Sequence, residues 1–293
     1  MTITQIDLTA TVNGVVYDLA DLIHYQFLDA DGFGMAPVKR LTQKGPMQDG
    51  VSDIGFRLDA RHLTLTLLAL GTDEASYYAA REALLSIFTP TVAPIKLTFY
   101  APPDRVRQID VHFNSNFSLP FKSRYGMSQQ DVIELYAPDP TWYDPVLVNI
   151  PFQASGGGTG MPFPLTFPVT FGATVSINQT QAVTNAGSYR TYPVIILYGP
   201  ITNPVITNTT TGEVLSFVGT AIGTNQTWTI DCRYGYKTVT DQLAVNKIAS
   251  LLLTSDLSTF HLEPGANSIN VTGGAVNGTT QASIQFYSRY VGI

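Results

Sequence analysis

Hydrophobic and polar residues alternate along several short stretches in the first half of the chain. From position 61 onward, Leu63, Leu65 and Leu67 alternate with histidine and threonine, which is typical of a strand with one buried face. The pair Asn13-Gly14, set between apolar residues, predicts a hairpin near the N-terminus. The same alternation predicts further strands at 95–100, 109–114 and 132–136.

One helix is expected between these strands. Tyr77, Ala80 and Leu84 are spaced so that they share one face of a helix. Thr72 or Asp73 is a suitable N-cap, and Pro90 ends the pattern. A single helix beside antiparallel strands predicts a mainly β fold for this half, as a split barrel or a β-sandwich with one α-helix.

The second half reads as short strands separated by turns, without a clear helix. Regular spacing of this kind, with glycine and proline between the strands, predicts a β-sandwich. Strands are expected at 165–171, 192–198, 214–218, 227–232, 268–272 and 282–290.

Two segments, 29–56 and 241–253, fit neither the strand period nor the helix period, and their structure stays open at this stage. We expect the first, taken as residues 32–57, to be irregular, since glycines and prolines interrupt it. A long irregular stretch in a compact domain usually has a function. We therefore expect it to lie across a neighbouring subunit or an adjoining ring of an assembly. Its hydrophobic residues are Phe33, Met35, Met47, Ile54 and Phe56.

A proline-rich segment at 137–145 separates two regions of different composition. Residues 1–145 carry 28 Asp, Glu, Lys and Arg, whereas residues 146–293 carry 10. We expect Trp142 and Tyr143 in this hinge to pack against one of the flanking bodies. The glycine-rich run at 155–160 is read as a flexible linker and not as a nucleotide-binding loop, because no strand precedes it. The predicted division is a domain at 1–145, a linker at 146–164 and a sandwich at 165–293.

The composition limits the kinds of partner. Charged residues make up 13% of the chain, about half of the usual ~25%, and such neutral surfaces are commonly covered by a partner. The net charge is −6 and the sequence contains no basic cluster, so binding to a nucleic-acid backbone is not expected. No signal peptide and no run of transmembrane length are apparent.

The sequence contains no recognisable motif for catalysis, cofactor binding or metal binding, and no residue is assigned to such a role. Cys232 is the only cysteine, and its strand pattern predicts a buried side chain, not a nucleophile. Asp59 and Arg61 share a strand face, and could form a local pair or reach a neighbouring subunit. We expect no enzyme. The scattered groups, interpreted as structural, are His24, His62, His112, His261, Glu134, Asp139 and Asp144.

The order of these features resembles the distal tail proteins of long-tailed, non-contractile bacteriophages. The resemblance extends over nearly the whole chain. It rests on Gly45-Pro46-Met47-Gln48-Asp49-Gly50 leading to Leu58-Asp59-Ala60-Arg61, then on the helix and the exit at 137–143. It continues in Tyr192-Pro193-Val194-Ile195-Ile196, Gly199-Pro200, Thr209-Thr210-Thr211-Gly212 and Leu262-Glu263-Pro264-Gly265-Ala266-Asn267.

The resemblance implies a structural virion protein at the phage tail tip. Its N-terminal domain would form a ring, typically a hexamer, that leaves a channel for DNA. The ring would join the tail tube and tape-measure proteins to the tail-tip hub or receptor-binding protein, without contact with a membrane. The second domain would be a galectin-like or carbohydrate-module-like sandwich. The acidic balance suits such a channel, because like charges repel DNA.

A different class of function is a carbohydrate-binding adhesin module for attachment to a host surface. Sugar binding needs an exposed aromatic side chain with polar neighbours, and Trp228 and Tyr236 are the candidates. Trp228 lies in a strand pattern and is expected in the core. The sequence leaves the host, the receptor, the ring stoichiometry and any binding of a host glycan open.

Overall fold

The computed structural model describes residues 7–101, 105–114, 119–154 and 176–293, which form two compact units. The first unit comprises Met1–Pro145 together with Tyr290–Ile293, and the second comprises Val146–Arg289. Strands are the main regular structure of both units, and α1 is the α-helix of the described chain. The mainly β fold with one α-helix is therefore confirmed. No helix among the described residues has the length and apolar character needed to span a membrane.

One large sheet forms the first unit, with the strand order β2-β1-β7-β8-β10-β6-β3. The predicted N-terminal hairpin is confirmed as β1 and β2, and Asn13 and Gly14 between them both have positive φ, as a tight hairpin turn requires. The strands are β1 (Asp7–Val12), β2 (Val15–Asp18), β3 (Tyr25–Asp31), β6 (Arg61–Leu70), β7 (Ile95–Ala101), β8 (Arg105–Phe113), β9 (Arg124–Tyr125), β10 (Ser128–Ala137) and β11 (Trp142–Tyr143), and η1 (Phe121–Ser123) is a 3₁₀ turn.

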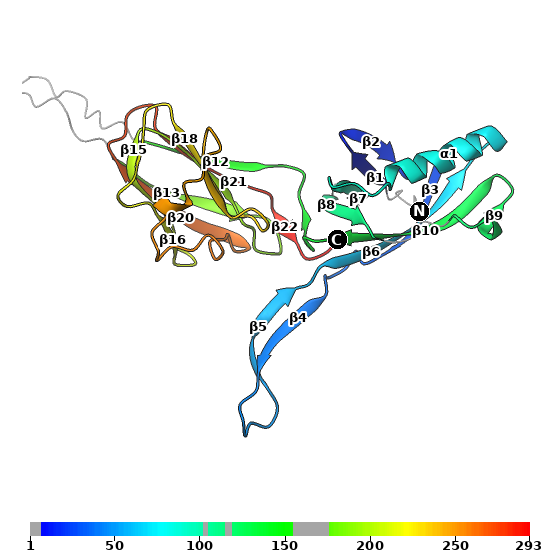
Figure 1. Cartoon of the computed structure of the whole chain (residues 1–293), viewed down its shortest axis with the longest axis horizontal. Coiled ribbons are helices and arrows are strands. Elements are labelled where there is room, and N and C mark those ends of the chain that lie inside the picture. Colours follow the sequence, from blue (N-terminus) through cyan, green and yellow to red (C-terminus); the bar gives the residue numbers. More distant parts are fainter. Residues whose placement is uncertain (1–6, 102–104, 115–118, 155–175) are drawn as a thin grey trace, which may run out of the picture. The chain divides into compact units, whose positions relative to one another are not determined.

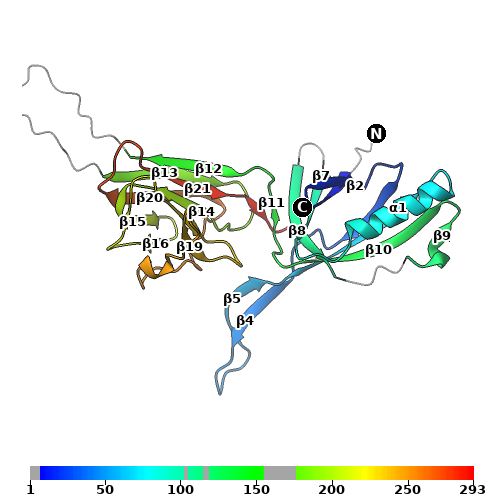
Figure 2. The ribbon, with the colours of Figure 1, turned by 45° about the horizontal axis from the view of Figure 1, so that its top comes forward.

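The helix α1 (Glu74–Ile87) packs against β6 and covers one face of its sheet (Figure 2). Asp73 is the N-cap: its carboxylate accepts the backbone N–H of Ser76, and the Ser76 hydroxyl completes a capping box. Alternate residues of β6, including Leu63, Leu65 and Leu67, are buried in the same core as the apolar face of α1. The alternation in the sequence thus predicted the correct face of this strand.

The prediction that residues 29–56 lack regular structure is wrong. Residues up to Asp31 complete β3, and β4 (Val38–Gln43) and β5 (Ser52–Leu58) form a hairpin that pairs only with itself. Figure 1 shows this hairpin extending away from β6 and β10. Both strands are largely exposed, so neither face needs to be apolar. The period-2 signal is absent for that reason, and the ladder hydrogen bonds alone define the strands.

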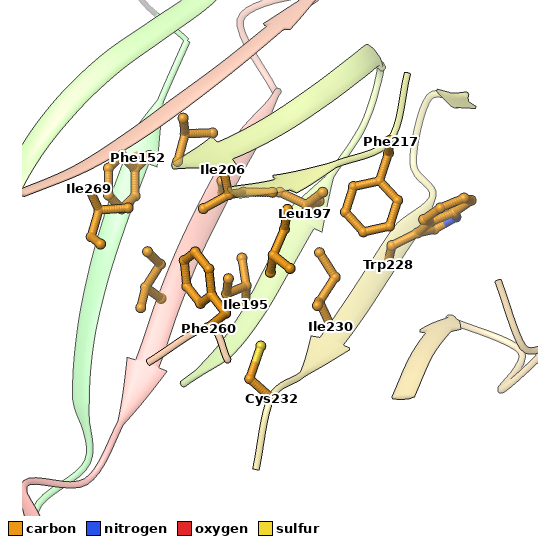
Figure 3. Packing of buried hydrophobic residues seen from close by; sticks show 14 of the residues in the cluster. Phe152, Ile195, Leu197, Ile206, Phe217, Trp228, Ile230, Cys232, Phe260 and Ile269 are labelled. Atoms are coloured by element: carbon orange, nitrogen blue, oxygen red, sulfur yellow. The ribbon is translucent and has the colours of Figure 1, made fainter. Parts of the chain in front are cut away.

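The second unit is a sandwich of two antiparallel sheets, in the orders β12-β21-β14-β18-β19 and β13-β20-β15-β16, with β17 beside β15. Its core lies between the sheets and includes Trp228 and Cys232 (Figure 3). The strands are β12 (Val148–Gln153), β13 (Ile177–Asn185), β14 (Val194–Tyr198), β15 (Ile201–Asn208), β16 (Glu213–Ser216), β17 (Ala221–Ile222), β18 (Thr227–Asp231), β19 (Thr238–Asp241), β20 (Gly265–Gly274) and β21 (Gln281–Phe286). The last strand, β22 (Arg289–Tyr290), is not part of the sandwich and pairs with β11.

Several boundaries differ from those expected. Residues 148–153, assigned to a linker from the sequence, form β12 and pair with β21. The predicted strand at 165–171 and the glycine run lie outside the described residues. Segment 241–253 contains the 3₁₀ turn η2 (Ile248–Ser250) after the end of β19. The last residues, Tyr290–Ile293, belong to the first unit, which a division by composition could not reveal.

Candidate assembly and binding surfaces

The hairpin β4–β5 exposes large apolar side chains. Met47 at its tip is 98% exposed, Ile54 64% and Phe56 44%. Arg40 lies over the Phe56 ring and pairs with Asp53 across the hairpin at 2.8 Å. Exposed apolar side chains grouped in this way are typical of a surface that contacts a partner. Phe33, which the sequence grouped with these residues, instead packs edge-on against Phe99 and Trp142 in the unit.

The face of the sheet that α1 leaves open is acidic. Asp29 and Asp31 on β3 are paired with Thr66 and Thr64 of β6, and Glu134 on β10 is opposite Thr64. Directly opposed residues lie on the same face, and these three carboxylates are exposed. Arg61 is the one Lys or Arg in β3, β6 and β10, and it is buried. This face therefore carries uncompensated negative charge.

The four histidines do not gather at one site. His62 and His112 are both opposite Tyr136, on its two sides in the sheet. His24 pairs with Asp21 at 2.7 Å, and His261 lies between Glu213 and Glu263 at 3.0 and 2.8 Å. In the part of the chain that the structure describes, no group of three or more acidic, histidine or cysteine residues has the arrangement of a metal site.

Arg61 is buried and has no carboxylate partner. Its guanidinium donates to the backbone carbonyls of Gly32, Gly34, Pro140 and Val291, at 2.5–2.8 Å. Burial lowers the pKa of Arg61 to about 10, so the group stays charged near neutral pH. Gly32 has a positive φ and lies against the carbonyl of His62, where a side chain would clash. The predicted local pair of Asp59 with Arg61 is therefore wrong, and Arg61 is buried within its own unit. A contact of the exposed Asp59 with a neighbouring subunit stays a prediction.

The hinge residues pack on the first unit. Trp142 is fully buried in its core, and the Tyr143 hydroxyl donates to Asp110 at 2.9 Å. Of the hinge carboxylates, Asp139 accepts a hydrogen bond from the Thr141 hydroxyl, and Asp144 lies 3.6 Å from Arg107. With Glu134 on the open sheet face, the three carboxylates do not converge on a common site.

In the second unit, Trp228 is 5% exposed and belongs to the core, as its strand pattern predicted. Tyr236 is 59% exposed and its neighbour Tyr234 61%. Both tyrosines lie in the turn between β18 and β19. Tyr234 contacts Tyr192 and Tyr236 contacts Arg233, and these two contacted residues line part of a hollow of about 230 Å³. Burial raises the pKa of the Cys232 thiol to about 12, which makes it unreactive at neutral pH. Sequence reasoning missed Tyr234 because no local pattern shows its contact with Tyr192, which lies 42 residues away.

Two family models match separate parts of the chain. The model described as phage tail protein RIFT-related domain matches residues 12–134. The model described as siphovirus-type tail component, C-terminal domain, matches residues 186–290. No curated protein matches the chain in sequence.

Solved phage structures share the fold. The Dit protein of phage SPP1, described as a paradigm of the hub adsorption apparatus in phages that infect Gram-positive bacteria, has 17% identity and a TM-score of 0.64. The match covers 96% of this chain and 98% of that one. A chain of the phage P2 baseplate in its activated conformation with Ca has 11% identity and a TM-score of 0.52, with the same two coverages. At these identities the likeness concerns the fold.

Proposed function

Because the chain belongs to the distal tail proteins of siphoviruses, we propose that its N-terminal unit forms a closed hexameric ring around a channel for DNA. A member of this family is a structural component of the virion, located at the tail tip, and assembles with other tail and baseplate proteins. The proposed ring joins the tail tube and tape-measure proteins to the host-adsorption hub. No catalytic role is proposed for any residue.

The observation that carries the ring is the exposed hairpin β4–β5. A closed ring of identical copies uses heterologous interfaces, in which the two contacting surfaces differ. A protruding hairpin with an apolar tip supplies one such surface, and the body of the next copy supplies the other. Burial of Met47, Ile54 and Phe56 would contribute roughly 1.5–3 kcal/mol per fully buried side chain.

The open acidic face of the sheet is the proposed lining of the channel. Asp29, Asp31 and Glu134 repel the phosphates of a passing DNA. The hydroxyls of Thr64 and Thr66 on the same face are polar and add no positive charge that would bind DNA. A surface of this kind lets DNA move along it without binding.

The ring is tested by the mass of the purified protein, measured by light scattering over a range of concentrations, and by electron microscopy of tails. We expect a ring, or assembly toward one that depends on concentration. The double variant Met47→Ser, Ile54→Ser is expected to remain folded and to lose assembly. Val92→Ser is the matched control, because Val92 is 99% exposed in the same unit but lies away from the hairpin.

Hydrogen exchange adds a local readout. Amides of β4 and β5 should exchange faster in the monomer than in the assembled ring, since in the monomer this two-stranded sheet has little packing against the unit. Equal protection in the two states would contradict the proposed contact between the hairpin β4–β5 and the next copy. A protein that stays monomeric at every concentration, with no ring in isolated tails, would contradict the ring itself.

Glycan binding is the second candidate function, and it is compatible with the ring. The exposed pair Tyr234 and Tyr236 next to a hollow is the observation in its favour.

A further inference from the structure

The turn between β18 and β19 presents two tyrosines to solvent in a fixed arrangement. Asp231, whose side chain is 9% exposed, accepts from Arg233 at 2.7 Å and at 3.0 Å, and the guanidinium lies over the Tyr236 ring at 4.4 Å. The ion pair therefore fixes Arg233, and Arg233 supports Tyr236 from one side. An exposed ring held in this way loses little conformational freedom when it binds a ligand.

Tyr234 is braced by a second set of contacts. Its hydroxyl lies 2.6 Å from that of the buried Tyr192, and their ring centroids are 4.4 Å apart. The Lys237 ammonium donates to the carbonyls of Cys232 and Leu257 and lies over both tyrosine rings, at 4.4 and 4.8 Å. The half-buried Lys237 therefore links the end of the turn to its beginning at Cys232 and to the distant Leu257, which restricts the motion of the turn.

The hollow beside this turn combines apolar walls with polar groups. Its volume is about 230 Å³, and its walls include Tyr192, Val194, Arg233 and Gln285. Val194 and Gln285 are paired across β14 and β21, so the floor is the outer face of the sheet. Aromatic rings next to a few fixed hydrogen-bonding groups suit a ligand with an apolar face and a polar edge.

Positive charge gathers at the same place. The sequence from 146 to 289 contains five cations, which are Arg190, Arg233, Lys237, Lys247 and Arg289. Arg233 and Arg289 line the hollow, Lys237 lies on its Tyr192 wall, and Arg190 interacts with Tyr192 and Tyr234. Asp231 is paired directly with Arg233, and Asp256 interacts electrostatically with Lys237. The described lining of the hollow itself contains Arg233 and Arg289 and no carboxylate. In a chain of net charge −6, this local excess of cations favours an anionic ligand.

We propose that the hollow and its two tyrosines bind a sugar ring that carries a carboxylate or phosphate group. The apolar face of the ring stacks on Tyr236 or Tyr234, the hydroxyls bond to Gln285 and Arg233, and the anionic group is attracted by the surrounding cations. The proposal rests on the second candidate function above. A negative result for sugar binding would not contradict the proposed ring, because the ring is tested with variants of the first unit.

The test titrates the full-length protein with glucose 6-phosphate, galacturonic acid, glucose and inorganic phosphate, using ligand-observed nuclear magnetic resonance up to about 10 mM. We expect glucose 6-phosphate or galacturonic acid to bind at least tenfold more tightly than glucose or phosphate. Tyr236→Ala and Tyr234→Ala should each weaken that binding at least tenfold, whereas Tyr236→Trp should change it by less than threefold because it keeps an aromatic surface.

Tyr125→Ala is the matched control, since Tyr125 is 89% exposed in the other unit, and melting curves check that each variant is folded. Absence of binding by all four probes, or binding that the tyrosine changes leave unaltered, overturns the proposal. If no probe binds and the folded Tyr236→Ala protein fails to enter tails, the surface is a contact for another tail protein and the glycan proposal is also overturned.

Discussion

Arg61 is a buried charge that four backbone carbonyls hold in place of a carboxylate. The acceptors come from residues 32, 34, 140 and 291, so one side chain ties three distant segments of the first unit together. A guanidinium suits this role because its five donors are fixed in a planar fork, whereas an ammonium cannot reach all four oxygens at once.

Replacement of Arg61 should therefore destabilise the first unit. Arg61→Lys and Arg61→Met leave buried carbonyls without donors, at a cost of roughly 1–3 kcal/mol for each carbonyl that water cannot reach. We expect a loss of about 3 kcal/mol in the free energy of unfolding, measured by urea denaturation. Arg40→Lys, at an exposed ion pair, should have a small effect. Equal effects of the changes at positions 61 and 40 would show that the carbonyl contacts contribute little.

At the scale of elements, the strands β3, β6 and β10 carry two different surfaces on their two faces. One face packs under α1, and the other exposes Asp29, Asp31 and Glu134. Strand period alone separates the two surfaces, because successive side chains point to opposite sides of the sheet.

Charge reversal on the open face tests its proposed contact with DNA. The double variant Asp31→Lys, Glu134→Lys should fold and assemble, since both side chains are exposed. It should slow the release of DNA from the virion at low salt, because lysines bind phosphates, and added salt should relieve the defect. Glu82→Lys on the exposed side of α1 is the control. DNA release at the wild-type rate at every salt concentration would remove this face from the channel lining.

At the scale of the whole molecule, the C-terminal residues complete the first unit. Val291 accepts from Arg61, Tyr290 lies under the Arg107 guanidinium at 3.6 Å, and the Ile293 amide donates to Phe33. The division predicted from the sequence implies a first domain that is complete at residue 145. The tail changes that expectation, because a chain that ends there lacks these three contacts.

We expect the fragment 1–145 to be less stable than the same fragment joined through a long flexible linker to residues 290–293. The difference should be about 1–3 kcal/mol in urea denaturation, the cost of leaving the Arg61 donor without its buried acceptor. A fragment with the same linker and a tail of glycine and serine is the control. If all three fragments unfold at the same urea concentration, the tail is not part of the folding unit.

The sequence by itself determined the features that neighbouring residues encode. The Asn13-Gly14 turn, the buried face of β6, the capped helix and the core position of Trp228 follow from periods of 2 and 3.6 and from turn chemistry. The ordered motifs along the chain were also sufficient to indicate the family. These features depend on a few consecutive residues, so no long-range contact is needed to predict them.

Only the tertiary structure decided the rest. The hairpin β4–β5 is exposed on both faces and so lacks the alternation that burial imposes on a strand. The partners of Arg61 include carbonyls 79 and 230 residues away, and no local pattern specifies such contacts. Tyr234 and Tyr236 became a candidate site because folding brings Tyr192, Arg233 and Gln285 together beside them. Burial and long-range contact are properties of the folded chain, and they determined which polar residues are structural and which remain available to a partner.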